Sequence, residues 1–306
     1  MVEKVTKIAV LMATHNGMRW IAEQIDSILR QKDVQIKLII SDDKSTDGTL
    51  EWLKTLAKKD SRIVLLPSLR SYGSAGKNFY RLILEADIGG CDYIALADQD
   101  DVWLKDKLKK QINALVKHSA CGVSSNVVAF WQDGSRSLAI KDSTMRRLDF
   151  LFESPGPGST FVLSPWLFNR VRILLTDPNG DANQVEFHDW LIYAVCRALG
   201  KKWHIYNAPL VRYRQHDKNA VGVNFGLKAI NYRFKRIVNG WYRSEVAKIA
   251  MLSQKLSQDA YVLASCETIL SQRLYARYKL LKLMPEARRK SMDCFILTIA
   301  SLFFIF

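Results

Sequence analysis

Short apolar runs alternate with longer stretches of helical periodicity over the first third of the chain. Four runs rich in β-branched residues predict strands, and three stretches with apolar residues on one face predict helices. Such alternation is typical of βαβ units, so we expect an α/β fold with a mainly parallel sheet flanked by helices. The predicted strands are residues 7–13, 36–40, 62–66 and 93–97, and the predicted helices are residues 18–30, 50–58 and 78–86.

The pattern becomes less regular further along the chain. We expect a helix over residues 103–115, a strand over 160–163 and a helix over 185–199, followed by a helical, basic region after Gly222. The sequence shows neither internal repeats nor low-complexity segments. We therefore divide the chain into a catalytic domain, residues 1–222, and a basic helical C-terminal appendage, residues 223–306.

Composition limits the class of protein. The chain has 306 residues and a formal charge of +15, and residues 226–306 hold 14 Lys and Arg against 5 Asp and Glu. This balance suits a nucleic acid, an anionic membrane surface or a phosphate-bearing substrate. The basic tail lacks interleaved aromatic residues that would stack on bases, so we expect no nucleic-acid partner. Five scattered cysteines without a C-x-x-C pair argue against disulfides and a zinc site.

The C-terminal end favours a membrane surface. Residues 294–306 carry no charge and follow Arg288, Arg289 and Lys290. Thirteen residues are too few to cross a bilayer, which takes about 20, so we expect this segment to lie in the lipid interface. Its alternative is a helix packed on the protein's own core. No signal peptide is apparent at the start, so we expect a cytoplasmic protein, peripheral on the inner face of the membrane.

Candidate chemistry begins with an acidic run at the end of the fourth predicted strand. Asp98, Asp100 and Asp101 place three carboxylates in four positions, where their repulsion calls for a positive partner. Carboxylates at this density suit Mg²⁺ or Mn²⁺. We expect Asp98 and Asp100 to serve the metal. Asp101 fits an ordinary helix N-terminus.

A second polar loop follows the second predicted strand. Asp42 and Asp43 precede Thr46 and Asp47, and either of the latter two fits the cap of the next helix. Capping does not explain Asp42 and Asp43. In parallel sheets, ligands bind at the carboxyl ends of the strands. A carboxylate placed there can accept the imide N–H of a pyrimidine base.

Together, these motifs resemble the family 2 glycosyltransferases of the GT-A fold. The matching stretches are ATHNG at 13–17, SDDKSTDGT at 41–49 and LADQDDVW at 96–103, in the family's order and spacing, and the resemblance covers roughly residues 5–220. FHDW at 187–190 and YRQH at 213–216 are further similar to bacterial rhamnosyltransferases of polysaccharide assembly.

The resemblance implies a donor site. Thr14, Asn16 and Asp43 would line the nucleoside pocket, Asp98 would face the ribose or the metal, and Asp100 would ligate the metal on the donor diphosphate. Residues 73–78, with Lys77, correspond to the loop that passes over the donor in this family. Lys77 is equally compatible with a solvated loop residue.

The resemblance also implies a catalytic base. Asp189 occupies the family's base position, although an aspartate there can also cap a helix. His216 matches a loop histidine that reaches the metal or diphosphate, and His188, Trp190 and Arg214 would contact the acceptor or phosphate. A single base with no second nucleophile predicts inversion of the anomeric centre.

The implied activity is transfer of a sugar from a nucleotide-sugar to a glycan or lipid-linked acceptor in surface polysaccharide synthesis of the O-antigen or capsule type. L-Rhamnose from dTDP-rhamnose is the leading donor by resemblance. A UDP-sugar donor (galactose, N-acetylglucosamine or glucose) remains open, as do an inactive nucleotide-sugar-binding module and a nucleotidyltransferase. Retention of Asp98, Asp100 and Asp189 argues against the inactive module, and a nucleotidyltransferase would not need Asp189.

Overall fold

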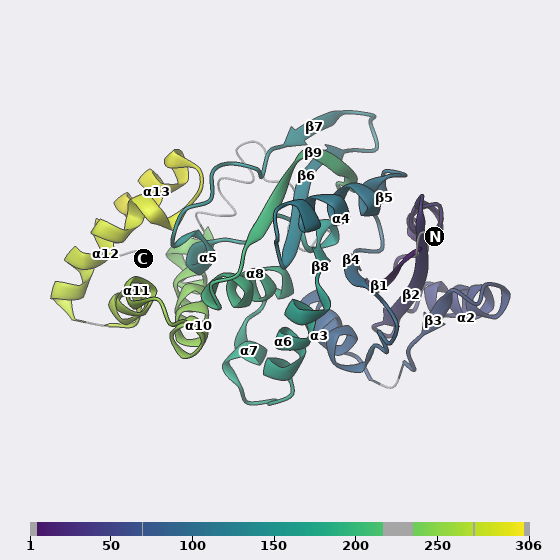
Figure 1. Ribbon diagram of the computed structural model, residues 1–306, viewed down its shortest axis with the longest axis horizontal. Helices are drawn as coiled ribbons and strands as arrows, with labels where there is room; N and C mark the ends of the chain where they lie inside the picture. Colours follow the sequence, from purple (N-terminus) through teal and green to yellow (C-terminus); the bar gives the residue numbers. More distant parts are fainter. Residues whose placement is uncertain (1–4, 69, 217–234, 272, 303–306) are drawn as a thin grey trace.

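A computed structural model of the protein describes residues 5–68, 70–216, 235–271 and 273–302. Its first half is the predicted βαβ arrangement (Figure 1). Four strands run parallel in the order β3-β2-β1-β4. The elements are β1 (Thr6–Thr14), α1 (Ile21–Leu29), β2 (Val34–Asp42), α2 (Thr49–Lys59), β3 (Ile63–Leu65), α3 (Ala75–Glu85) and β4 (Tyr93–Ala97).

The sheet continues through β8, which lies within the strand predicted over residues 160–163, and through further strands that the sequence pattern did not predict. Beyond β4 the order is β8-β6-β9-β5, with β7 paired to β6. β8 is antiparallel to both neighbours, whereas β6 and β9 run parallel. β6 lacks apolar alternation because its buried centre is polar, Ser124, Ser125 and Asn126. The bounds are β5 (Val102–Trp103), β6 (Gly122–Phe130), β7 (Arg136–Ala139), β8 (Val162–Leu163) and β9 (Trp203–Arg214).

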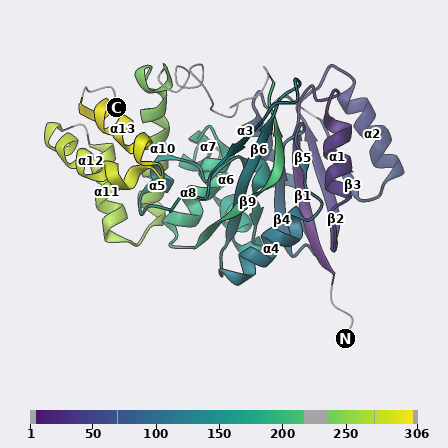
Figure 2. The same ribbon diagram turned by 90° about the horizontal axis from the view of Figure 1, so that it is seen from above.

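Each face of the sheet has its own hydrophobic core. Successive side chains of β1 point to opposite faces, so Val10 packs beneath α1 and α4 while Leu11 packs beneath α3, α6 and α8. Both side chains are fully buried. Figure 2 shows these helices on the two sides of the strands. The remaining helices of this part are α4 (Lys107–Lys117), α5 (Asp149–Phe152), η1 (Gly158–Thr160), α6 (Pro165–Leu175), α7 (Asp181–Gln184) and α8 (His188–Ala198).

Several predicted helix starts differ from the structure, and the helices expected from residues 18 and 185 begin at Ile21 and His188. The expected helix over 103–115 begins only at Lys107, because Trp103 belongs to β5, which pairs with β9. Asp101 therefore does not lie at a helix N-terminus. α3 begins three residues earlier than expected, at Ala75, because the Ser74 hydroxyl accepts the N–H of Lys77 at 3.3 Å.

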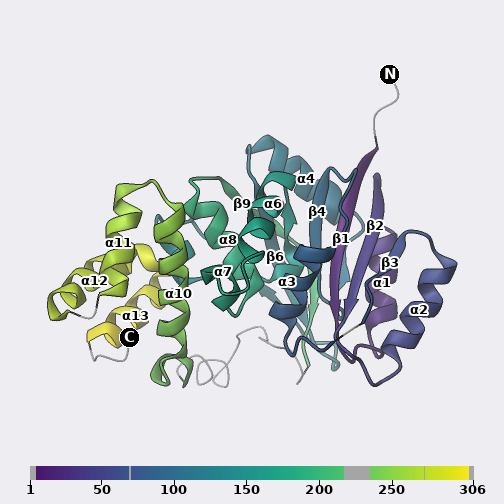
Figure 3. The same cartoon turned by 90° about the horizontal axis from the view of Figure 1, so that it is seen from below.

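Four helices close the described chain at one end of the molecule (Figures 1 and 3). They are α10 (Trp241–Leu256), α11 (Ala260–Leu270), α12 (Leu274–Ala287) and α13 (Ser291–Leu302). α10 attaches to the catalytic part through Tyr242, whose hydroxyl donates to the Phe152 carbonyl at 2.6 Å. The expected boundary at 222/223 lies outside the described residues. Within the described ranges, no helix combines the length and apolarity needed to cross a bilayer.

Two of the three basic residues before α13 point inward, which differs from the expected headgroup contact. Arg289 is 7% exposed, and its N–H donates to Glu153 at 2.6 Å. Its guanidinium lies 3.4 Å from Asp149. Arg288 pairs with Glu153 and Asp293, each at 3.3 Å. These two arginines bind internal carboxylates, and only Lys290 of the basic triplet is exposed.

Candidate active site

The loops after β1 and β4 are joined side by side at the carboxyl edge of the sheet. Gln99 accepts the His15 N–H at 2.8 Å and donates to the His15 carbonyl at 2.9 Å. Gly17 lies so close to this amide that a Cβ there would be 2.3 Å from the Gln99 oxygen. The loops after β1 and β4 thus meet, and a side chain at position 17 would displace the Gln99 amide from its two bonds to His15.

Asn16 joins the loops after β1 and β2. Its backbone is left-handed, with φ of 50°, a conformation that asparagine tolerates. The Asn16 N–H donates to Ser45 at 2.8 Å, and its side-chain oxygen accepts the Thr46 N–H at the same distance. Asp47 accepts the N–H of Thr49 at 3.1 Å at the start of α2, but the N-cap position itself is Gly48, so Asp47 is not the cap that the sequence suggested.

The two carboxylates after β2 have different partners. Asp42 is fully buried and accepts bonds from the hydroxyls of Thr14, at 2.9 Å, and Ser45, at 2.6 Å. The Thr14 side chain is thus engaged inside the fold. Asp43 accepts the backbone N–H groups of Tyr72 and Gly73, at 2.5 and 2.9 Å. A carboxylate has about four acceptor positions, so Asp43 retains capacity for a nucleobase while holding this loop.

The carboxylates of the acidic loop after β4 are buried near one another, so their negative charges repel. Burial, followed by the negative charges of Asp100 and Asp189, raises the pKa of Asp98 to about 7. Burial, followed by the negative charges of Asp100 and Asp98, raises the pKa of Asp101 well above its ordinary value. One Asp101 oxygen accepts the Arg214 N–H at 3.2 Å, and the other has no hydrogen-bond partner among the described residues. This excess of negative charge favours a bound cation.

The end of β9 contributes the next part of the site. The His216 ring stacks on Trp20 with centroids 4.1 Å apart, and its Nε2 lies 2.8 Å from Asp100 Oδ2. The Arg214 guanidinium donates to the Asp100 carbonyl at 2.8 Å and to Glu23 at 2.5 Å. The structure thus brings two predicted metal ligands, Asp100 and His216, into contact.

The chemistry of these donors fits Mg²⁺ or Mn²⁺. Asp100 and His216 offer an adjacent carboxylate oxygen and ring nitrogen, with Asp98 two residues away along the loop. The described residues contain no cluster of three or more metal-ligating side chains. Mg²⁺ sites of nucleotide enzymes commonly use only one or two protein carboxylates, the remaining ligands coming from water and substrate phosphate.

Asp189 lies in the first turn of α8. It does not cap the helix, because the N-cap is Phe187, which makes no side-chain capping bond. Burial raises the pKa of Asp189 to about 6. Its negative charge also raises the pKa of Asp98. A carboxylate with a pKa near neutrality suits a general base.

The flanking residues of α8 are packed inside the protein. His188 stacks on Phe79 with centroids 3.9 Å apart, and burial lowers its pKa to about 3, so it is neutral. A Cβ at Gly158 would lie 2.3 Å from its Nε2. Trp190 is 4% exposed and donates to the Phe150 carbonyl at 2.9 Å. Because of these positions, neither side chain enters our proposal as an acceptor or phosphate contact.

Two lysines show what the sequence indicated and what it missed. Lys77 is exposed in the first turn of α3, not in a loop, because α3 starts at Ala75. Lys141 was not predicted. Its positive charge lowers the pKa of Asp189, and burial lowers its own pKa to about 8. Nothing in the sequence around Lys141 distinguishes it, because only the fold brings it near Asp189.

The sheet with acidic loops at its carboxyl edge and a buried carboxylate on α8 defines a glycosyltransferase of the GT-A type. Residues 9–171 match the family described as "Glycosyl transferase family 2". The chain is 41% identical over 252 residues to the dTDP-rhamnosyl transferase RfbG of Shigella flexneri, covering 82% of this chain and 86% of the relative. The chain therefore belongs to glycosyl transferase family 2.

Two solved structures confirm the fold. S. aureus TarS 1-349 in complex with UDP-GlcNAc matches with a TM-score of 0.59 and 14% identity, over 97% of this chain and 81% of TarS. The mannosyltransferase PcManGT of Pyrobaculum calidifontis, in complex with GDP-Man and Mn²⁺, matches with a TM-score of 0.52 and 15% identity, over 98% and 81%. At these identities the likeness concerns the fold alone.

Proposed function

We propose that the protein transfers a sugar from a nucleoside diphosphate sugar to a hydroxyl of a glycan acceptor, with inversion of the anomeric centre. The observation that carries this proposal is Asp189, a buried carboxylate whose pKa of about 6 suits a base and whose charge reaches the acidic loop. No second nucleophile is required.

The proposed reaction is a single displacement. The acceptor O–H gives its proton to the Asp189 carboxylate as the acceptor oxygen forms a bond to the anomeric carbon. The bond from that carbon to the diphosphate oxygen breaks, and the nucleoside diphosphate leaves with the electron pair. Attack on the face opposite the leaving group inverts the centre, as in one-step glycoside hydrolysis.

The donor diphosphate would bind beside Asp100 and His216. Mg²⁺ or Mn²⁺ held by these residues, with Asp98 nearby, supplies positive charge against the departing diphosphate when bound. Arg214 orders the acidic loop through its bond to the Asp100 carbonyl. Asn16 and Asp43 border the nucleoside end. Lys77 and Thr14 contribute less, because one is exposed on α3 and the hydroxyl of the other binds Asp42.

The sugar is proposed to be L-rhamnose from dTDP-rhamnose. The support is the 41% identity to a dTDP-rhamnosyl transferase across most of both chains. A glycan or lipid-linked oligosaccharide of bacterial surface polysaccharide synthesis is the corresponding acceptor. A UDP-sugar remains the alternative donor.

A thermal-shift screen tests the donor. The protein is heated with deoxythymidine or uridine diphosphate-sugars, each with Mn²⁺, Mg²⁺ or chelator. A ligand at 100 times its Kd adds about 2.7 kcal/mol to stability. We expect a metal-dependent rise in melting temperature with dTDP-rhamnose. A rise confined to UDP-sugars would contradict the rhamnose assignment, and equal rises with chelator would contradict the metal.

The proposed location is an anionic membrane surface, contacted through α13. One face of α13 packs on the protein through Cys294, Leu297 and Ala300. The other face is apolar and exposed, with Phe295 at 61% and Met292 at 69%. Exposed Lys279, Lys282 and Lys290 lie on and beside the adjoining α12. Residues 303–306 of the expected interfacial segment lie outside the described residues.

Vesicle flotation tests this location. Phe295→Ser with Ile296→Ser removes exposed apolar area without touching the packed face, so we expect less protein to float with phosphatidylglycerol vesicles. Each nearby lysine contributes about 1 kcal/mol at an anionic surface, so neutral phosphatidylcholine vesicles should bind less protein. Met251→Ser, an exposed apolar position on α10, is the control. Unchanged flotation of the double variant would place the contact elsewhere.

A further inference from the structure

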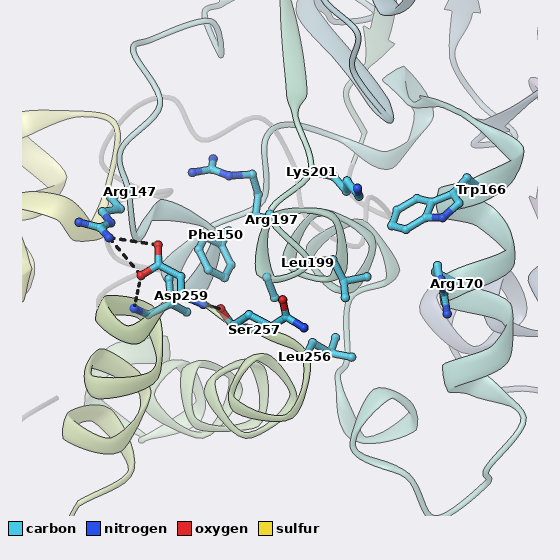
Figure 4. A pocket seen from close by; sticks show the side chains of 14 residues that line it. Arg147, Phe150, Trp166, Arg170, Arg197, Leu199, Lys201, Leu256, Ser257 and Asp259 are labelled. Atoms are coloured by element: carbon cyan, nitrogen blue, oxygen red, sulfur yellow. Dashed lines mark hydrogen bonds and ion pairs between the residues drawn. The ribbon is translucent and has the colours of Figure 1, made fainter.

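A second cavity lies away from the acidic loops, where the catalytic part meets the C-terminal helices. Its volume is about 530 Å³, and it is bounded by α6, the end of α8 and the turn between α10 and α11 (Figure 4). α8 has Asp189 in its first turn and Ala198 at its end, and a helix rises about 1.5 Å per residue. The cavity is therefore separate from the proposed base by most of the length of α8.

The cavity carries positive charge that lacks internal compensation. Arg170 and Lys201 lie 5.5 and 5.2 Å from the centroid of the same indole ring, that of Trp166. An aromatic face attracts cations, so the Trp166 ring interacts favourably with each of them. Neither cation has a carboxylate partner among the residues that the structure describes. Figure 4 shows Trp166, Arg170 and Lys201 together on one side of the cavity.

The other two arginines of the cavity are already paired. Arg147 lies 3.0 Å from Asp259, and Arg197 lies 3.0 Å from Asp149. Their charges are balanced within the protein. The uncompensated charge is thus confined to Arg170 and Lys201, at the Trp166 side.

The residues that line the cavity indicate which kind of anionic ligand would fit it. Guanidinium and ammonium groups together suit a phosphate, the first by its planar fork and the second as a point charge. Gln258 and Ser257 supply polar groups, and Leu199 and Leu256 supply apolar surface. A volume of several hundred Å³ suits a small molecule. We propose that this cavity is a second binding site, for a phosphorylated saccharide, distinct from the donor site.

Isothermal titration of the full-length protein with glucose 1-phosphate tests the proposal. Saturating dTDP and Mn²⁺ are present throughout, so that the donor site is filled. We expect binding that weakens at least tenfold in the Arg170→Gln, Lys201→Gln double variant. Lys202→Gln is the control. Lys202 is the next residue and carries the same charge, but it does not line the cavity.

The results separate the proposal from its rivals. Equal binding in the double variant and the wild type would overturn the site, and glucose 1-phosphate binding no tighter than inorganic phosphate would overturn the saccharide assignment. Initial rates then distinguish the source of the ligand. A raised acceptor KM in the double variant indicates the phosphate-bearing end of a glycan acceptor, whereas a rate change on adding glucose 1-phosphate indicates a free sugar phosphate. The titration needs no transfer activity, so it stands apart from the proposed reaction.

Discussion

At the scale of single residues, Asp189 sets the expected pH dependence of transfer. Burial raises its pKa to about 6. A base accepts a proton only when it is ionised, so activity should be full above this pKa and should fall as the pH drops through about 6. The pH profile of kcat/KM measures this limb.

A variant identifies the group responsible for the limb. Asp189→Asn should lower kcat by about 10²- to 10⁴-fold while donor affinity stays near normal. Asp106→Asn should leave both values unchanged, because Asp106 is a half-buried carboxylate just before α4 that pairs with Lys110. An acidic limb near pH 4, or wild-type turnover in Asp189→Asn, would remove Asp189 from the base role.

His188 should make the fold sensitive to acid. Its pKa is about 6.5 when unfolded and about 3 when folded, because burial disfavours the charged ring. As the pH falls from 6.5 toward 3, the unfolded chain binds a proton at this histidine that the folded chain does not bind. The free energy of unfolding therefore decreases over this pH range. Urea unfolding of His188→Phe should show a weaker pH dependence over that range. An identical slope in wild type and variant would contradict the buried, neutral histidine.

At the scale of elements, the loops of the acidic edge were predictable because βαβ alternation places strand ends together. The density of carboxylates suggested a metal role for Asp98 and Asp100, the family resemblance added His216, and the structure then showed Asp100 in contact with His216. Asp101 was misassigned because a two-residue strand, β5, carries no periodicity that a sequence pattern can show. Lys141 was missed for a similar reason, since its position near Asp189 depends on tertiary packing.

The contact between the acidic loop and the end of β9 should determine metal dependence. Asp100→Ala removes a carboxylate next to His216, so Mn²⁺-dependent donor binding should weaken at least tenfold. Titration of donor with and without Mn²⁺ measures the effect. Asp106→Ala serves as the control for loss of an acidic side chain. Donor binding with an unchanged Mn²⁺ requirement in Asp100→Ala would count against the metal assignment.

At the scale of the whole molecule, the C-terminal helices are part of the folded protein because buried ion pairs join them to the catalytic part. Arg289 reaches Asp149, which Tyr193 and Arg197 also bind. The linear sequence showed three basic residues before an apolar run and could not show that two of them turn inward. The basic residues were therefore visible in the sequence. The carboxylates that bind Arg289, Glu153 and Asp149, were not, because they lie 136 and 140 residues away from it.

Arg289→Met should test this junction. Removing one partner of a buried ion pair leaves the other uncompensated, so the free energy of unfolding should fall by about 3 kcal/mol. Lys290→Met, the exposed neighbour, should change it little. Urea denaturation measures both variants. Equal stability of Arg289→Met and Lys290→Met would mean that the pairs with Asp149 and Glu153 do not hold the helices.

The whole molecule is proposed to carry out a single displacement assisted by one base. The most direct measurement is nuclear magnetic resonance of the anomeric centre in the product that forms from dTDP-rhamnose and a glycan acceptor. Inversion relative to the donor is the result that one buried carboxylate, Asp189, predicts. Retention would require two displacements and a nucleophile, and it would contradict the proposed mechanism.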